Sequence, residues 1–155
     1  MKSPVGLLRL VASEEELLAV IFEKSKAQEQ KGLRAIEESR GHPLLGHVEK
    51  QLRQYFSGRL KSFDIPLGLY GTPFQVAVWN ELLKIPYGRT CSYGDLASRI
   101  GDAKKARPVG GAVGSNPIGI IVPCHRVIGK DGSLTGFGGG LDVKTYLLNL
   151  ETRWA

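Results

Sequence analysis

Cysteine and histidine are both scarce in this sequence, and each scarcity excludes a class of protein. Among 155 residues there are only two cysteines, Cys91 and Cys124, too few for a disulfide framework and compatible with a reducing compartment. The three histidines, His42, His47 and His125, and the cysteines show neither CxxC nor HxxxH spacing. We therefore expect no metal site and no structural zinc.

Long apolar runs are also missing. No stretch approaches the roughly 20 apolar residues that a membrane-spanning helix needs. The first residues, MKSPVGLLRLVASEEE, reach a charged run too soon for a secretory signal peptide. Because 42% of the residues are hydrophobic and 23% are charged, the composition is that of an ordinary globular protein. We expect an intracellular, cytoplasmic protein without a membrane partner.

Positive charge is in excess and is unevenly distributed. The formal net charge is +6 and the pI is about 9.4. Residues 1–71 carry 11 Lys+Arg against 9 Asp+Glu, whereas residues 72–155 carry 10 against 6. The second half is therefore the better candidate for a surface that binds a polyanion such as nucleic acid.

The first half of the chain indicates a small mixed α/β unit. Two apolar runs, Val5 to Ala12 and Leu17 to Phe22, favour a β-hairpin, although Ser13 with Glu16 also fits a capping box that opens a helix. After Pro43, apolar residues recur at three- and four-residue steps, so we expect an amphipathic helix over Leu44 to Phe56.

Three further segments complete the first half. Residues 24–42 are charged and suggest a surface loop, with a short helix or strand near Leu33 to Ile36. Phe63 to Leu67 suggests another strand. The segment LGLYGTP has two glycines and a proline in seven residues, so we place the boundary between two subdomains there, with residues 1–67 on one side and 68–155 on the other.

The second half reads as consecutive helices. Thr72 and Pro73 are an N-cap and a first helical residue, and Ser92 can cap a second helix that Gly101 ends. We expect a third helix over Lys104 to Val113, with Pro108 tolerated only in its first turn. The helix pair with its short glycine-containing connection matches a DNA-binding helix-turn-helix, and close helix packing explains it equally well.

The stretch NPIGIIVPCHRVI contains the residues that most suggest chemistry. Cys124 follows an apolar run, Ile118 to Val122, which we predict to be a strand, and Pro123 is expected to present the thiol at a rim. A hydrogen-bonding His125 or a cationic Arg126 would favour the reactive thiolate. The alternative is a cysteine that serves as a small buried hydrophobe.

The chain ends in a glycine-rich loop and a helix. Gly129 to Gly132 suggests a turn, and four glycines within residues 136–140 predict a flexible loop. These glycines either offer backbone amides to a ligand or simply bend the chain. The following segment, Leu141 to Glu151, has apolar residues at helical spacing and predicts a closing helix.

Five motifs together carry a resemblance to a known family. The segments GTPFQVAVW, IPYGRTCSYGDLA, ARPVGGAVGSNP, IVPCHRVIG and GGLDVKTYLL closely resemble the O6-alkylguanine-DNA alkyltransferases over residues 68–151, and residues 1–67 match loosely. The resemblance implies an α/β (α+β) fold class. It combines a ribonuclease-H-like N-terminal subdomain with a helical C-terminal subdomain that contains a winged-helix-like helix-turn-helix.

The resemblance also implies catalytic roles. Cys124 corresponds to the alkyl acceptor, His125 to the residue that deprotonates it through a water, and Glu151 to the carboxylate that orients the histidine. Asn116 corresponds to the residue that supports the active-site turn. Tyr93 is similar to the tyrosine that contacts DNA, helps to rotate the damaged nucleotide and protonates its base.

Further residues correspond to DNA and substrate contacts. Arg107 resembles the finger that fills the vacated base stack, and Gly94 resembles a backbone contact to phosphate. Val127, Phe137 and Gly138 correspond to the substrate pocket. Phe137 stands where many relatives carry tyrosine and Gly138 replaces a larger residue, which predicts a roomier pocket wall.

The function implied is the repair of DNA by direct, irreversible and stoichiometric alkyl transfer. The substrate would be O6-alkylguanine, and less readily O4-alkylthymine, in double-stranded DNA, acted on by a monomer without a cofactor. A thioether product has no carbonyl for water to attack, so a protein molecule would act once. Two alternatives remain: a damage-recognition protein of the same fold without transfer, and a thiol hydrolase that uses Cys124 and His125 without DNA.

Overall fold

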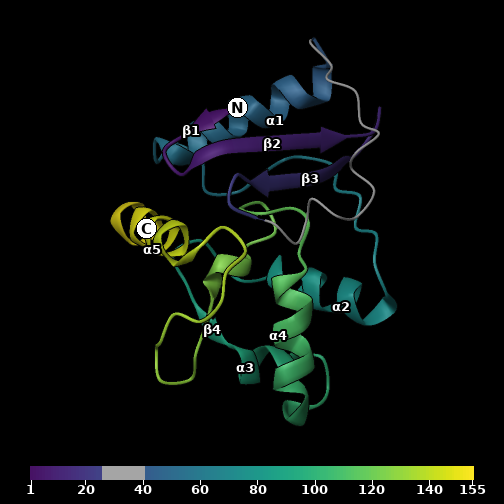
Figure 1. The fold of residues 1–155 in the computed structure, drawn as a ribbon, viewed down its shortest axis with the longest axis vertical. Coiled ribbons are helices and arrows are strands. Elements are labelled where there is room, and N and C mark those ends of the chain that lie inside the picture. The colour runs from purple at the N-terminus through teal and green to yellow at the C-terminus, as the bar shows by residue number, and fades with distance from the viewer. Residues whose placement is uncertain (26–40) are drawn as a thin grey trace.

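The computed structural model describes residues 1–25 and 41–155, and it divides into an N-terminal sheet with one helix and a C-terminal helical part (Figure 1). The strands are β1 (Lys2–Ser3), β2 (Gly6–Ala12), β3 (Leu17–Phe22), β4 (Cys91–Ser92) and β5 (Val127–Ile128). The helices are α1 (Pro43–Phe56), α2 (Pro73–Leu82), α3 (Tyr93–Arg99), α4 (Ala106–Gly114) and α5 (Leu141–Trp154). Two short 3₁₀ helices, η2 (Ala103–Lys105) and η3 (Cys124–Arg126), precede α4 and β5.

The predicted hairpin is confirmed. Strands β1, β2 and β3 form an antiparallel sheet in that order, and β3 pairs with β2 from Leu17 to Phe22. β3 is apolar at consecutive positions because both of its faces are buried. Phe22 and Val20 belong to the main core, whereas Ile21 and Ala19 belong to a separate cluster on the opposite face.

The predicted helix after Pro43 is also confirmed as α1, which lies along the sheet (Figure 1) and buries its inner face in the main core. The ring nitrogen of His42 caps it by accepting a hydrogen bond from the Leu45 amide. Val48, Leu52 and Tyr55 are fully buried on its inner face. The short element expected near residues 33–36 lies outside the described residues.

The strand predicted over Phe63 to Leu67 is wrong. Only Leu67 forms a bridge, with Leu17 at the free edge of β3. Pro66 has no amide hydrogen, so it contributes only its carbonyl, which accepts from the Leu17 amide at 2.8 Å. The apolar side chains of this segment pack on the core from an irregular chain.

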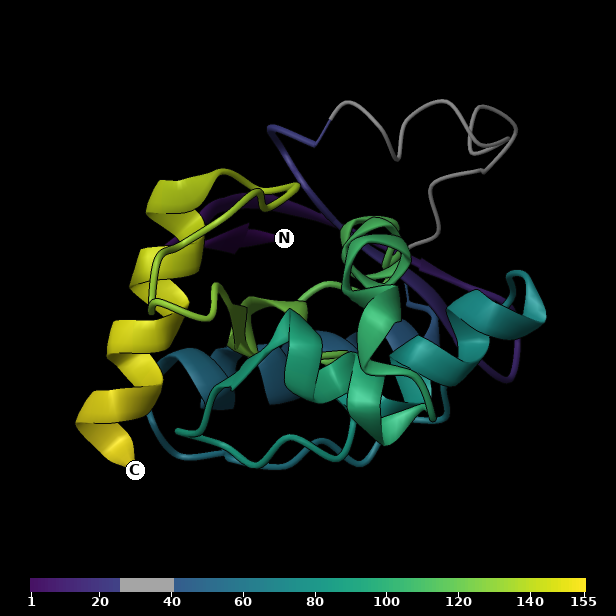
Figure 2. The same ribbon diagram turned by 90° about the horizontal axis from the view of Figure 1, so that it is seen from below.

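The helical part follows the predicted caps closely. Thr72 with Gln75 and Ser92 with Asp95 form capping boxes that begin α2 and α3. α3 and α4 pack against each other and both contact α2. The helix predicted from Lys104 divides into η2 and α4, and Pro108 is the third residue of α4, in its first turn. Figure 2 shows α5 along one flank of the molecule, beyond these helices.

α5 extends to Trp154, three residues beyond the predicted end. Its inner face buries Val143, Leu147 and Leu150, whereas Tyr146, whose spacing also suggested burial, is 39% exposed. Within the described parts of the chain, no helix is long and apolar enough to cross a membrane.

The strand predicted over Ile118 to Val122 is wrong as well, because this run is a compact turn. The Val122 amide donates to the Ile118 carbonyl at 3.1 Å, and Ile120 has a left-handed φ of 70°, which is strained for a β-branched residue. The turn docks on β3 through two hydrogen bonds of Val20, from its amide to the Pro117 carbonyl and from the Gly119 amide to its carbonyl. The N-terminal sheet therefore supports the turn that leads to Cys124.

A Gly119→Ala variant tests how tightly this turn is docked. A Cβ at residue 119 would lie 2.5 Å from Cε2 of Phe22 and 3.2 Å from the Val20 carbonyl oxygen, so the turn or the ring must shift. We expect the free energy of unfolding in urea titrations to fall by about 1–3 kcal/mol.

Gly111→Ala is the matched control, because Gly111 lies on the exposed face of α4 and a methyl group added there would meet no atom within 4 Å among the described residues. This substitution should raise the unfolding free energy by about 0.5–1 kcal/mol. Equal responses of the two variants would contradict the docking of the turn on β3.

Candidate active site

Asn116 closes the turn that precedes the cysteine. Its side-chain oxygen accepts a hydrogen bond from the Ile118 amide at 3.0 Å, and its side-chain nitrogen donates to the Val122 carbonyl at 2.9 Å. Asn116 is buried, so these two bonds are shielded from water. The side chain therefore connects both ends of the turn, which suits the supporting role expected of Asn116.

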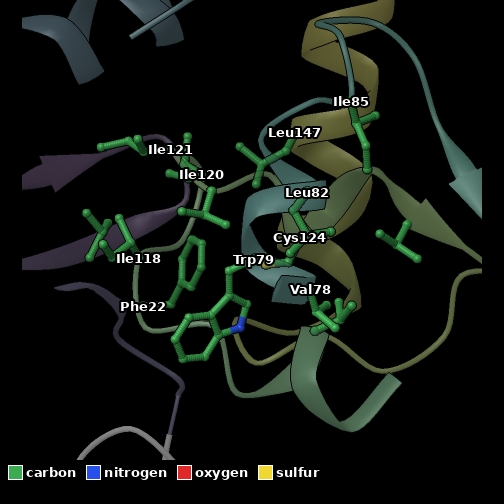
Figure 3. Close-up of a cluster of buried hydrophobic side chains, with 14 of the residues drawn as sticks. Phe22, Val78, Trp79, Leu82, Ile85, Ile118, Ile120, Ile121, Cys124 and Leu147 are labelled. Atoms are coloured by element: carbon green, nitrogen blue, oxygen red, sulfur yellow. The ribbon is translucent and has the colours of Figure 1, made fainter. Parts of the chain in front are cut away.

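Cys124 begins the 3₁₀ helix η3 and is buried, with 8% of its surface exposed, rather than presented at a rim as predicted. Its side chain belongs to the same buried cluster as Trp79, Val78 and Leu82 (Figure 3). Burial raises the pKa of the Cys124 thiol, while Asn116, the Lys144 ammonium and the backbone amides of η3 act in the opposite direction. At neutral pH Cys124 is thus a thiol, and the groups that would stabilise its thiolate already surround it.

His125, the next residue, is fully buried and points its Nε2 at Glu151, 2.5 Å from Oε2. Burial lowers the pKa of His125 despite the nearby carboxylate, so the ring is neutral at pH 7. We assign the proton to Nε2, because that nitrogen faces an ionised carboxylate. The lone pair is then on Nδ1, which has no hydrogen-bond partner among the described residues.

The Glu151 carboxylate is the centre of a buried polar cluster. Its oxygens accept hydrogen bonds from the Tyr55 hydroxyl at 2.6 Å and from Nε and a terminal nitrogen of Arg126 at 2.7 and 3.1 Å. The Gly88 amide adds a contact at 3.2 Å. Burial alone would raise the pKa of Glu151, but the hydrogen bonds from His125 and Arg126 and the charge of the Arg126 guanidinium outweigh burial and hold the pKa well below its usual range. Glu151 therefore remains ionised.

Arg126 is not the cation that acts on the thiol, which the sequence left as one of two ways to favour the thiolate. Its guanidinium donates to the Glu151 carboxylate and the Ile85 carbonyl. The cation that acts on Cys124 is Lys144, a residue that sequence reasoning missed. Lys144 is 1% exposed, and its ammonium donates to the Val127 carbonyl at 2.6 Å and to the Thr135 carbonyl at 3.2 Å.

A signal for Lys144 does exist in the sequence. Lys144, Leu147 and Glu151 follow one another at steps of three and four residues, so they share the inner face of α5. A lysine and a glutamate on an otherwise apolar stripe predict buried charges that need partners.

The two carbonyl partners of this lysine belong to β5 and to the loop, the segments that carry the residues expected to form the substrate pocket. Val127 is fully buried in β5, and Thr135 donates from its hydroxyl to the Tyr93 hydroxyl at 3.0 Å. Phe137 is half-buried, and Gly138 is exposed in the same loop. Lys144 thus connects β5 with the loop that carries the other pocket residues.

The residues expected to bind DNA lie apart from the buried cluster. Arg107 is exposed at the second position of α4, and Gly94 lies in the first turn of α3. Cys91 is buried in β4, as expected for a core residue, and burial raises the pKa of its thiol. Within residues 1–25 and 41–155, no three His, Cys, Asp or Glu side chains are grouped so as to hold a metal ion.

A Glu151→Gln variant tests the energetic importance of the buried cluster. It leaves the buried Arg126 guanidinium without a counter-charge, so we expect a loss of about 3–5 kcal/mol in unfolding free energy. Tyr55→Phe removes one hydrogen bond to the carboxylate and should cost about 1.5–3 kcal/mol. Thermal and urea unfolding measure both changes.

Tyr87→Phe provides the control, since the Tyr87 hydroxyl is buried and has no hydrogen-bond partner in the described part of the chain. Removing this hydroxyl should leave the unfolding free energy unchanged or slightly higher. A Tyr55→Phe variant as stable as Tyr87→Phe would contradict the role assigned to the Tyr55 bond.

Comparison with known proteins finds two family profiles that match this chain. The profile described as 6-O-methylguanine DNA methyltransferase, ribonuclease-like domain, matches residues 1–69, and that of the DNA binding domain of the same protein matches residues 73–153. Both descriptions agree with the fold class expected from the sequence.

Individual relatives agree with the profiles. A methylated-DNA–protein-cysteine methyltransferase of Methanosarcina acetivorans is 47% identical over 97% of this chain and 94% of its own length, and one of Haemophilus influenzae is 46% identical over 96% and 82%. The crystal structure of Mycobacterium tuberculosis OGT in complex with DNA matches with a TM-score of 0.92 and 44% identity, covering 100% of this chain and 92% of that one. The chain belongs to the 6-O-methylguanine DNA methyltransferase family.

Proposed function

We propose that this protein repairs DNA by transferring the alkyl group of O6-alkylguanine, and less readily of O4-alkylthymine, to Sγ of its own Cys124. The observation that carries the proposal is the buried group formed by Cys124, His125 and Glu151, in which the cysteine follows the turn that Asn116 closes. Membership of the family supports the reaction class. The protein acts as a cytoplasmic monomer on double-stranded DNA and needs no cofactor.

The proton of the thiol leaves toward His125. The ring is neutral, and its Nε2–H donates to Glu151, so Nδ1 is free to accept the proton directly or through one water. Glu151 stabilises the resulting imidazolium, while Lys144 and the η3 amides stabilise the thiolate. The arrangement thus lowers the cost of forming the nucleophile in a buried position.

The thiolate then displaces guanine from the alkyl carbon. A sulfur–carbon bond forms, the bond between the carbon and O6 breaks, and the electron pair leaves with the base. Tyr93 is the donor that neutralises the departing guanine. Its oxygen accepts from Thr135, which leaves its own proton free to be donated. The product is a thioether that water does not cleave, so each molecule reacts once.

DNA docks on the exposed face of η2 and α4. Lys104, Lys105 and Arg107 are exposed there, next to the glycines of α4. Gly111 and Gly114 have open space around them, so this helix can approach a groove closely. Gly94 offers its amide to a phosphate. Arg107 fills the base stack after the damaged nucleotide has rotated into the pocket.

Mass spectrometry after incubation with duplex DNA that contains one O6-methylguanine tests the function directly. One methyl group should be added per protein molecule, and peptide mapping should place it on Cys124. Cys91→Ala should still react fully, whereas Cys124→Ala should bind the DNA without transfer. Binding by the wild type without methylation would favour a recognition protein, and multiple turnovers without DNA would favour a thiol hydrolase.

The role of Arg107 predicts a dependence on the form of the substrate. Arg107→Ala removes the side chain that fills the gap left in the base stack, so it should slow repair of duplex DNA by about tenfold or more. The reaction with free O6-benzylguanine, which has no base stack, should be nearly unchanged. Arg59→Ala, which removes the same charge from an exposed position after α1, should change neither rate. Equal losses on duplex and free base would exclude this role.

A further inference from the structure

Phe22, the last residue of β3, touches both segments that border the proposed pocket. The residue is 5% exposed and lies among Trp79, Ile118 and Ile120 (Figure 3). It comes from the N-terminal sheet, whereas the nucleophile and the pocket residues come from the C-terminal part. Its contacts therefore cross between the two halves of the chain.

The far end of the ring lies against the turn that leads to Cys124. A Cβ at Gly119 would be 2.5 Å from Cε2 and 2.9 Å from Cζ of Phe22. Only a glycine allows the ring and the backbone to approach this closely. Any change in the position of the ring is thus transmitted to the turn that Asn116 closes.

The near end of the ring lies against the loop that carries Phe137 and Gly138. A Cβ at Gly139 would be 2.8 Å from Cγ of Phe22 and 3.1 Å from Cε1 of Phe137. The two phenyl rings pack with centroids 5.3 Å apart and an interplanar angle of 59°. With four glycines in five residues, this loop has little conformational preference of its own, so the aromatic contact fixes its position.

We infer that Phe22 is a positioning residue that determines which alkyl groups the protein accepts, because its ring sets the separation between the Cys124 turn and the pocket wall. This inference rests on the proposed function. A shorter side chain at residue 22 leaves the wall unsupported. The small methyl group then loses its alignment with Sγ, whereas a larger alkyl group fills the added space.

Phe22→Leu tests the inference on two matched duplexes that carry O6-methylguanine or O6-benzylguanine at the same position. Single-turnover rate constants are normalised to the fraction of protein that reacts, so a loss of folded protein does not alter them. The ratio of benzyl to methyl transfer rates should rise about tenfold relative to the wild type. An unchanged or lower ratio would overturn the inference.

Ile21→Ala is the control variant, because Ile21 is the neighbouring residue of β3, equally buried, in the cluster on the opposite face. It should reduce stability while leaving the rate ratio at the wild-type value. A ratio that rises as much as in Phe22→Leu would assign the effect to general loosening of the sheet and overturn the inference.

A double-mutant cycle with Gly139→Ala examines the same contact from the loop and does not depend on how well Phe22→Leu folds. Gly139→Ala alone should slow methyl transfer, because its Cβ collides with Phe22. Adding Phe22→Ala removes the Cγ and Cδ2 atoms with which that Cβ collides, so the double variant should react faster than Gly139→Ala alone. Independent effects would overturn the inference. A wild type that transfers neither alkyl group would instead refute the proposed function.

Discussion

The buried carboxylate of Glu151 is the constraint on which the site depends. Five donor groups converge on its two oxygens, and they come from α1, from the turn before β4 and from η3. A buried charge with fewer partners would be costly, so these elements have to be in place together. The orientation of His125 therefore follows from the packing of Tyr55 and Arg126 as much as from its own position in the chain.

A second constraint is the edge of β3. Val20 holds the turn before Cys124 by two backbone hydrogen bonds, and Phe22 fills the space next to that turn. The turn contains Ile120 in a strained left-handed conformation, which persists only where its surroundings determine it fully. Asn116 and the N-terminal sheet supply these surroundings. The reactive segment is thus shaped by contacts that reach far along the sequence.

Features encoded by neighbouring residues could be predicted from the sequence, and features that depend on distant contacts could not. The cap at Ser92 is local, and its helix was correctly predicted. The apolar run from Ile118 to Val122 is as compatible with a strand as with a buried turn, because hydrophobicity alone does not distinguish the two. The pairing of Glu151 with His125 was expected from the family resemblance, but its contacts with Tyr55 and Arg126 were not, and Tyr55 is 96 residues away in sequence. Lys144 was missed because lysines are mostly exposed, although its helical spacing pointed inward.

Burial of Cys124, the proposed acceptor, has a consequence for how long the protein keeps its capacity to react. A thiolate, rather than a thiol, attacks peroxides and disulfides, and these reagents must be able to reach the sulfur. Cys124 is enclosed by the core and the pKa of its thiol is raised. Before substrate binds, the sulfur is therefore neither a thiolate nor easily reached. A protein that uses its sulfur in a single event benefits from this protection, because accidental oxidation would remove a molecule as surely as repair does. The same burial that makes the thiol a weak nucleophile in isolation thus preserves it until a damaged base enters the pocket.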